Sequence, residues 1–203
     1  MKIPQIRCSD VNAVKRIIFL LVLLIPFCLA GCSSDDDEGD NGGEGPNEDA
    51  PVSYVLGSGN TNMPSSGTII AQYADAPVGS EIRRLVDDNA DTKYVTYHSS
   101  FNITWNGNSS KAVTAYSLTS ADTPEMDPKD WTLYGSNDNT TWTELDAQTN
   151  QLFAARKEEK SYEVDNATSY RYYRLSVEAN NGGAATQIAE WKLVAMRSYT
   201  ENI

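Results

Sequence analysis

Cysteine and histidine are both scarce in this sequence of 203 residues. All three cysteines fall within the first 32 positions, and the single histidine is His98. A domain formed by the rest of the chain cannot contain a disulfide, so its own hydrophobic core, with or without a bound metal, must stabilise it. One histidine and no thiol also leave few groups for nucleophilic or acid–base catalysis.

Basic residues are also few, with 16 Lys and Arg against 28 Asp and Glu and a net charge of −12. The missing basic patch excludes nucleic acid as a partner and excludes electrostatic docking on anionic lipid. The sequence lacks G-x-S-x-G, H-E-x-x-H and a phosphate-binding loop. A pair of carboxylates for glycoside hydrolysis stays possible, because acidic residues are plentiful. We nevertheless predict that the protein is not an enzyme.

The N-terminus has the layout of an export signal. A positively charged stretch precedes the apolar run Ile17–Ala30, which is shorter than the about 20 residues of a spanning helix. The run ends in Leu29-Ala30-Gly31-Cys32, which resembles the bacterial lipobox. We predict a signal peptide over residues 1–31 and a lipid anchor on Cys32, which would attach the protein to the outer membrane. An ordinary signal peptide with a chance cysteine is the alternative.

Residues 32–50 follow as an acidic, polar segment without a large apolar side chain. Such a segment cannot bury enough surface to fold, so we predict a flexible tether. Acidic residues directly after the cysteine resemble the export signal that sends some lipoproteins to the cell surface. A merely solubilising linker is the other interpretation.

Residues 51–203 show the pattern of one all-β domain. Short runs rich in Thr, Val, Tyr, Ile and Trp alternate with turn-forming clusters, which is typical of a sandwich or jelly roll. Only 80–86 and 150–156 indicate a helical turn. The predicted strands are Thr68–Ala74, Lys93–Tyr97, Phe101–Trp105, Ala112–Thr119, Trp131–Ser136, Thr141–Leu145, Ser161–Val164, Tyr170–Ala179 and Gln187–Ala195.

Three parts of this domain carry a family likeness: Arg84–Tyr94, Trp131–Trp142, and Tyr172–Val177 together with Gln187–Trp191. In this order and spacing they resemble the discoidin domain, also called the coagulation factor 5/8 type C domain. The likeness extends from about residue 65 to 196. It implies a galactose-binding-like jelly-roll β-sandwich from a family that includes carbohydrate-binding modules. We expect the conspicuous aromatic residues to pack in the core rather than stack on a ligand: Tyr94, Trp131, Trp142, Tyr173 and Trp191.

The loop 84–92 is the strongest candidate for a metal site, because its side chains offer several oxygen atoms around a tight turn. Oxygen ligands with two carboxylates suit calcium rather than zinc. The resemblance implies a structural calcium ion that ties this loop to the last strand, with these ligands: Arg84, Asp87, Asn89, Thr92, Ala189 and Glu190. The alternative is an Asp-rich turn capped by its own side chains.

Ligand-binding residues are expected in the loops of the rigid sandwich. The candidates are Tyr97, His98, Asp127, Lys129, Asn180 and Asn181. Galactose-binding members of the family are similar in having a histidine here, but this chain has Met126 where an arginine is expected. It also lacks an aromatic residue in the loop before the last strand. The resemblance therefore does not imply galactose specificity. The alternative role for His98, that of a solvated loop residue without a ligand, stays open.

Two functions of different classes fit these observations. The first is a non-catalytic surface lipoprotein that binds a glycan or polysaccharide through the discoidin-like domain. The second is an adhesin or assembly protein that uses the same fold to bind a protein partner, and a contiguous exposed apolar patch would favour it. A glycoside hydrolase is the third and least supported reading.

Overall fold

A computed structural model of the chain describes residues 49–195. The predicted signal peptide, Cys32 and nearly all of the predicted tether lie outside these residues. No helix within 49–195 is long and apolar enough to cross a membrane. The described chain forms two short 3₁₀ helices, η3 (Ile82–Val86) and η4 (Pro124–Met126). Its strands are β1 (Val52–Leu56), β2 (Gly67–Ala71), β3 (Tyr94–Thr96), β4 (Phe101–Lys111), β5 (Val113–Thr119), β6 (Pro128–Ser136), β7 (Thr143–Gln148), β8 (Glu159–Glu163), β9 (Tyr170–Asn180), β10 (Thr186–Ile188) and β11 (Glu190–Ala195).

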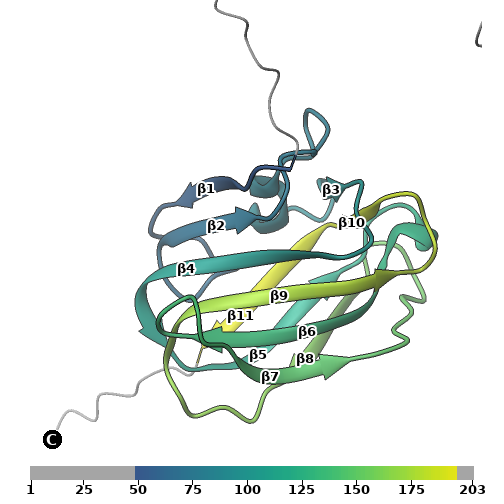
Figure 1. The fold of residues 1–203 in the computed structure, drawn as a ribbon. Helices are drawn as coiled ribbons and strands as arrows, with labels where there is room; N and C mark the ends of the chain where they lie inside the picture. Colours follow the sequence, from purple (N-terminus) through teal and green to yellow (C-terminus); the bar gives the residue numbers. More distant parts are fainter. Residues whose placement is uncertain (1–48, 196–203) are drawn as a thin grey trace, which may run out of the picture. The chain divides into compact units, whose positions relative to one another are not determined.

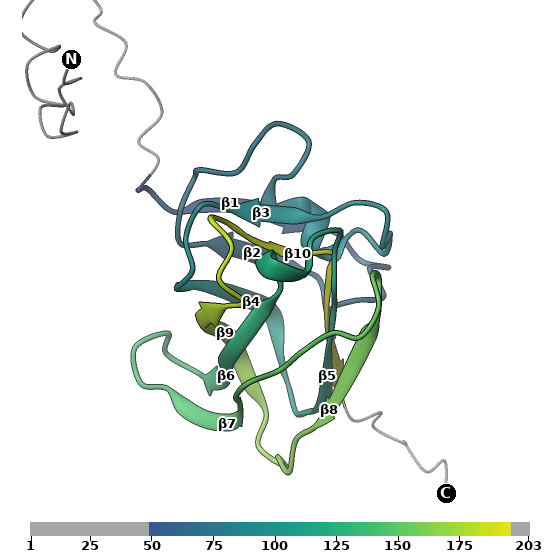
Figure 2. The same cartoon turned by 90° about the vertical axis from the view of Figure 1, so that its right-hand side faces the viewer.

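The strands form an antiparallel sandwich. One layer is a six-stranded sheet in the order β1-β2-β4-β9-β6-β7, and behind it lies a three-stranded sheet in the order β11-β5-β8 (Figure 1). The pair β10-β3 forms a small third sheet at one end of the sandwich (Figure 2). The connections place strands distant in sequence side by side, as in β4 beside β9. This is the galactose-binding-like jelly roll that the sequence predicted.

The core follows from the two-residue period of the strands, because alternate side chains point to opposite faces of a sheet. On β9, Tyr173, Leu175 and Val177 are fully buried between the layers, and the residues between them face outward. Trp131 on β6 is also fully buried, and its indole N–H donates to the Tyr116 hydroxyl at 2.8 Å. Truncation of such a buried aromatic costs about 3–5 kcal/mol.

Most sequence predictions for the core and the elements are confirmed. All nine predicted strands are present, the last of them divided by a bend at Ala189 into β10 and β11. The helical turn at 80–86 is η3. Tyr94, Trp131, Tyr173 and Trp191 are all buried in the core. Strand β1 and the short helix η4 were not predicted.

Two predictions are wrong. Residues 150–156 form no helical turn, because Asn150 adopts a positive φ of 53° and the Gln151 N–H donates to the Lys129 carbonyl at 3.0 Å. Trp142 is not a core residue: it lies in the β6–β7 loop and is only half-buried. The Arg174 guanidinium covers its ring at 3.9 Å, so this indole packs on the outer face of the six-stranded sheet.

Candidate functional sites

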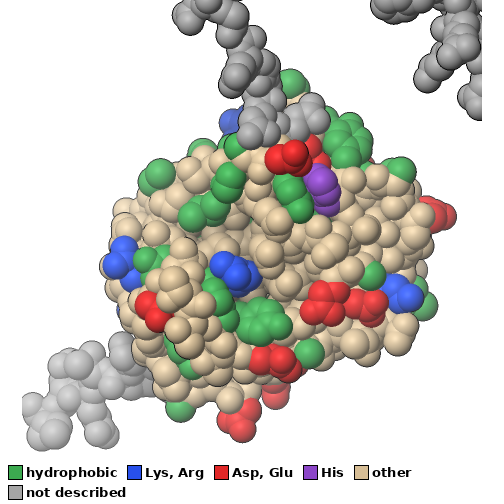
Figure 3. Space-filling view, viewed as in Figure 1, with side chains coloured by type: hydrophobic (Ala, Val, Ile, Leu, Met, Phe, Trp, Pro, Cys, Tyr) green, Lys and Arg blue, Asp and Glu red, His purple; other side chains and the backbone are tan. Residues whose placement is uncertain are grey.

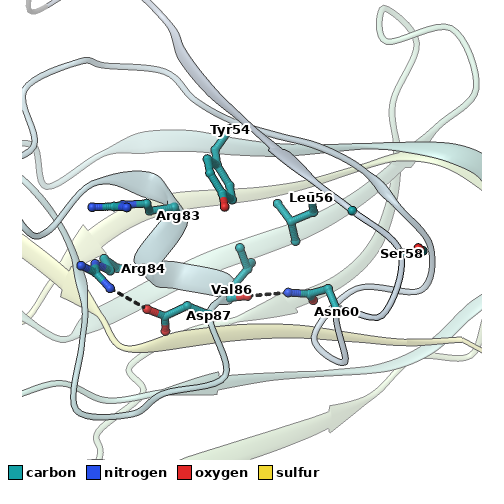
Figure 4. Close-up of a pocket in the computed structure, with 9 residues that line it drawn as sticks. Tyr54, Leu56, Ser58, Asn60, Arg83, Arg84, Val86 and Asp87 are labelled. Atoms are coloured by element: carbon teal, nitrogen blue, oxygen red, sulfur yellow. Dashed lines mark hydrogen bonds and ion pairs between the residues drawn. The ribbon is translucent and has the colours of Figure 1, made fainter.

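The turn after η3 is closed by its own polar groups. The Thr92 hydroxyl lies 2.8 Å from the Asp87 carboxylate and 3.0 Å from the Asn89 carbonyl oxygen. Asp88 takes the left-handed backbone region with a φ of 58°, which Asp tolerates better than most residues. The Arg84 guanidinium pairs with Asp87 at 3.2 Å (Figure 4). The turn therefore brings together the loop residues predicted to bind calcium.

Glu190 at the start of β11 lies against this turn. Its side chain is 3% exposed, and one carboxylate oxygen accepts the Asn89 backbone N–H at 2.7 Å. Burial raises the pKa of Glu190 from 4.5 to about 7, and the neighbouring Asp87 carboxylate contributes to the increase. Ala189 lies in the bend before Glu190 and donates its N–H to the Thr119 carbonyl at 2.9 Å. Loop and last strand therefore meet as the sequence predicted.

Asn62 belongs to the same site, although sequence analysis did not identify it. Its side chain is buried, and its amide N–H donates to the second carboxylate oxygen of Glu190. The Asn62 carbonyl oxygen Oδ1 is buried without a hydrogen-bond partner in the described part of the chain. Asn62 belongs to no sequence motif, and its contact with Glu190 could not be predicted from the sequence because the two residues lie 128 positions apart. Beside it, Asn60 donates to the Val86 carbonyl at 2.7 Å (Figure 4).

The chemistry of this group fits a hard cation. Two carboxylates, hydroxyl and amide oxygens and nearby carbonyls are the ligands that calcium prefers. The buried Oδ1 of Asn62 has no partner among the described residues, and burial beside Asp87 raises the pKa of Glu190, so a cation bound here would have both an oxygen ligand and a carboxylate to stabilise it. Within residues 49–195 no group of three or more His, Cys, Asp or Glu side chains forms a metal cluster, so backbone and amide oxygens would have to complete the shell.

The predicted ligand loops converge at one end of the sandwich, the end that faces the viewer in Figure 2. The Thr186 hydroxyl donates to the His98 carbonyl at 2.8 Å and accepts from the Asn180 amide at 3.2 Å. The Asn181 N–H donates to the Asp127 carbonyl at 3.1 Å. Three loops distant in sequence therefore form one hydrogen-bonded surface.

His98 is held by residues that sequence analysis did not single out. Its ring stacks on Tyr73, with centroids 3.7 Å apart and planes at 16°. Its Nε2 atom lies 3.7 Å from the Asp75 carboxylate, which also accepts the Tyr97 N–H at 2.6 Å. The Tyr97 side chain is 62% exposed. His98 is thus a positioned ring beside an exposed tyrosine rather than a freely solvated side chain.

Two of the predicted ligand residues have structural contacts instead. Asp127 is 1% exposed, and the Arg156 guanidinium holds both of its oxygens at 2.9 and 2.7 Å. This arginine comes from the 150–158 loop, not from position 126. The Asn180 amide is buried and donates to the Gly183 and Ala185 carbonyls. Both side chains brace the loops and do not face solvent.

A shallow cavity of about 240 Å³ lies between the 121–130, 150–158 and 180–183 loops, and neither Tyr97 nor His98 is among its lining residues. Its rim includes Leu152, which is 67% exposed, and Asn181. Gly183 allows the loops to approach closely, since a Cβ there would lie 2.7 Å from the Glu125 carbonyl oxygen. Lys129 lies half-buried at the start of β6. The cavity is lined by Pro124, Glu125, Asp127, Leu152, Phe153 and Asn181.

An all-β jelly roll with loops gathered at one end and an acidic turn against its last strand defines the class of galactose-binding-like domains. The model of the F5/8 type C domain family matches residues 68–191, which is more than half of the chain. The chain belongs to this family.

Solved structures share the fold. A family 32 carbohydrate-binding module from Clostridium perfringens, CpGH89CBM32-5 in complex with GalNAc-β-1,3-galactose, is 15% identical with a TM-score of 0.53 and covers 70% of this chain and 100% of that one. The family 32 module of Streptococcus pneumoniae EndoD is 14% identical with a TM-score of 0.53, covering 71% and 96%. CBM62 from Clostridium thermocellum Xyl5A is 20% identical with a TM-score of 0.53, covering 65% and 96%.

One curated relative matches over a shorter segment. A peptide-N(4)-(N-acetyl-β-glucosaminyl)asparagine amidase of Arabidopsis thaliana is 46% identical over 80 residues. The match covers 36% of this chain and 11% of that protein. The chain therefore corresponds to about a tenth of this relative.

Proposed function

We propose that this protein is a non-catalytic surface lipoprotein that binds carbohydrate through the converging loops. Lipid on Cys32 would attach it to the outer membrane, and residues 32–50 would hold the domain away from the bilayer. The family, and the carbohydrate-binding modules among its structural neighbours, support a glycan ligand.

The observation that carries the proposal is the arrangement of side chains at the loop end. An exposed Tyr97 and the Tyr73–His98 stack supply aromatic faces for the C–H side of a sugar ring. The imidazole of His98 supplies a polar group for the sugar hydroxyls. The cavity between the other loops adds Asn181 as a polar group and Leu152 as apolar surface. A few placed polar groups beside apolar surface are typical of small-ligand sites.

A non-catalytic role fits the state of two buried carboxylates at this end, Asp127 and Asp75. Asp127 is neutralised by Arg156, and Asp75 accepts hydrogen bonds from the Thr96 hydroxyl and the Tyr97 N–H. A glycoside hydrolase needs two carboxyl groups free to act on the scissile bond, one as acid and one as base or nucleophile. These two carboxylates are instead engaged in holding the loops.

Calcium would have a structural part in this function. The carbonyls of Arg84 and Ala189 and the oxygens of Asp87, Asn89, Thr92 and Glu190 would hold it, with Asn62 as an additional neighbour. When bound, the ion would supply positive charge next to Glu190, in addition to that of Arg84, which pairs with Asp87. The chain's own residues then fix the turn after η3 against β11, which follows directly on the ligand-side strand β10.

A glycan array probed with the full chain tests the proposal. Binding should fall at least tenfold in Tyr97→Ala and in His98→Ala, because each removes part of the ring platform. Tyr172→Ala is the matched control, since this tyrosine lies at the opposite end of β9 from the ligand loops. Full binding by both loop variants, or binding to proteins but to no glycan, contradicts the proposal.

A further inference from the structure

Arg174 lies in the middle of the outer face of the six-stranded sheet, away from the ligand loops. On β9 it is paired with Thr104 of β4 on one side and Tyr134 of β6 on the other. It faces outward because its neighbours Tyr173 and Leu175 point into the core. Figure 3 shows this face of the molecule, where backbone atoms and side chains that are neither hydrophobic nor charged cover most of the centre.

The guanidinium of Arg174 is fixed in place, and within residues 49–195 it forms no ion pair with a carboxylate. It covers the Trp142 ring at 3.9 Å, and its Nε donates to the Thr104 hydroxyl at 3.3 Å. None of the ion pairs between described residues includes Arg174, although the whole chain carries a net charge of −12. Burial alone lowers the pKa of Arg174, as expected for a guanidinium without a carboxylate beside it.

A cavity of about 240 Å³ opens next to this guanidinium. Among the described residues that line it there is no Asp or Glu, and most of the lining side chains are amides or hydroxyls. The lining residues are Pro51, Ile70, Gln72, Asn102, Thr104, Asn139 and Arg174. Uncharged hydrogen-bonding groups around a single positive charge suit a ligand that carries hydroxyls and one anionic group.

The cavity is connected to the proposed ligand loops by a row of hydrogen bonds. The Gln72 side-chain oxygen accepts from the Asn102 amide at 3.0 Å, and the Gln72 amide donates to the Tyr73 hydroxyl at 2.8 Å. Tyr73 is the residue that stacks on His98. A polar strip therefore leads from the loop end across the outer face to Arg174.

We propose that Arg174 and the side chains around it form a second subsite, which binds the carboxylate of a uronic acid in an extended glycan. A guanidinium forms two parallel hydrogen bonds to a carboxylate, and Trp142 and Thr104 hold the Arg174 fork ready for them. Gln72, Asn102 and Asn139 supply partners for the sugar hydroxyls. This subsite rests on the proposed carbohydrate function and adds an acidic sugar at a defined position.

Titration calorimetry with the full chain tests the subsite. The probes are an oligogalacturonate, a neutral galactan oligosaccharide of the same length and a sulfated galactan oligosaccharide. The oligogalacturonate should bind at least tenfold more tightly than the neutral chain, and added salt should weaken this difference. Arg174→Gln should abolish the difference, and Arg174→Lys should restore only part of it, because an ammonium keeps the charge but not the fork.

Arg171→Gln is the matched control. This arginine is on the same strand and also stacks on an aromatic ring, Tyr172, at 5.5 Å, but it does not line the cavity. Trp142 provides an independent readout, because the other three tryptophans are buried. The oligogalacturonate should protect tryptophan fluorescence from acrylamide quenching in the wild type and not in Arg174→Gln.

The outcomes separate this inference from the proposed function. Equal affinity for acidic and neutral chains, or tight acidic binding that Arg174→Gln leaves intact, overturns the subsite and leaves the loop site standing. Preference for the sulfated chain overturns the assignment to a carboxylate. Loss of binding in Arg171→Gln as well points to general charge attraction and also overturns it. Absence of binding to all three probes, with the chain folded by circular dichroism, refutes the subsite, whereas the glycan array decides on the proposed function.

Discussion

Two buried carboxylates near the candidate sites have opposite environments. Asp127 at the ligand loops is 1% exposed, and Arg156 forms hydrogen bonds to both of its oxygens. Glu190 at the turn after η3 is 3% exposed, and its charged neighbour is another carboxylate, Asp87, which itself pairs with Arg84. Among the described residues, a basic side chain therefore contacts Asp127 directly, whereas none contacts Glu190.

This difference distinguishes a buried carboxylate that the protein already pairs with a basic side chain from one that a bound cation would stabilise. A buried charge is tolerated when an opposite charge and hydrogen bonds accompany it. Asp127 has both, so it needs nothing from solution. Glu190 has hydrogen bonds from Asn89 and Asn62 but no basic side chain in contact with it within residues 49–195. Burial raises the pKa of both carboxyl groups, but Arg156 opposes the increase at Asp127, whereas the Asp87 carboxylate adds to it at Glu190.

The largest expected effect comes from removing the counter-charge that the chain supplies. Arg156→Gln leaves Asp127 buried and unpaired, so we expect a loss of about 3 to 4 kcal/mol in the free energy of unfolding at pH 7. Urea denaturation measures it. The double variant Asp127→Asn with Arg156→Gln should recover part of the loss. A decrease below about 1 kcal/mol in the single variant would mean that the pair is not effectively buried.

The second prediction concerns pH in calcium-free protein. Because the pKa of Glu190 is higher in the folded than in the unfolded state, the folded protein binds this proton more tightly. Stability is therefore present in full below about pH 4.5 and decreases as the pH rises through about 7, by roughly 3 kcal/mol. Denaturation in chelator between pH 5 and 8 measures this decrease. Glu190→Gln should remove it, and an identical pH profile in this variant contradicts the assignment to Glu190.

The third and smallest effect is stabilisation by calcium itself. At a free calcium concentration 100 times the Kd, binding to the folded state alone adds about 2.7 kcal/mol. The melting temperature should therefore rise with calcium and fall with chelator in the wild type. Glu190→Gln should be unresponsive, while Asp127→Asn should respond like the wild type. A melting temperature that calcium leaves unchanged refutes the site.

The sequence predicted the features that depend on local pattern. Alternation in Tyr173, Leu175 and Val177 placed β9 correctly, because one face of the strand is buried. Strand β1 was missed because it is an edge strand, and three of its five residues are exposed. The strand therefore lacks the alternation of buried and exposed residues by which a strand is recognised in a sequence.

Features that depend on contacts between distant segments were not predictable in this way. Trp142 was expected in the core from its hydrophobicity, but it precedes β7 and packs under Arg174 on the outer face. Arg156 reaches Asp127 from a loop expected to be a helical turn. Asn62 carries no motif, and only the folded chain brings it to Glu190.

The edge position of β1 has a mechanical consequence. If the protein is tethered through the residues before Val52, any load from a bound ligand enters the domain at this strand. The β1–β2 pairs, from Val52 with Ala71 to Leu56 with Gly67, would then open one after another, a geometry that resists force weakly. Unzipping would next pull on the following loop, where Asn62 contacts Glu190. An ion bound beside these residues would hold the loop and β11 together. The calcium concentration around the domain would then determine how much force the domain withstands before it unfolds.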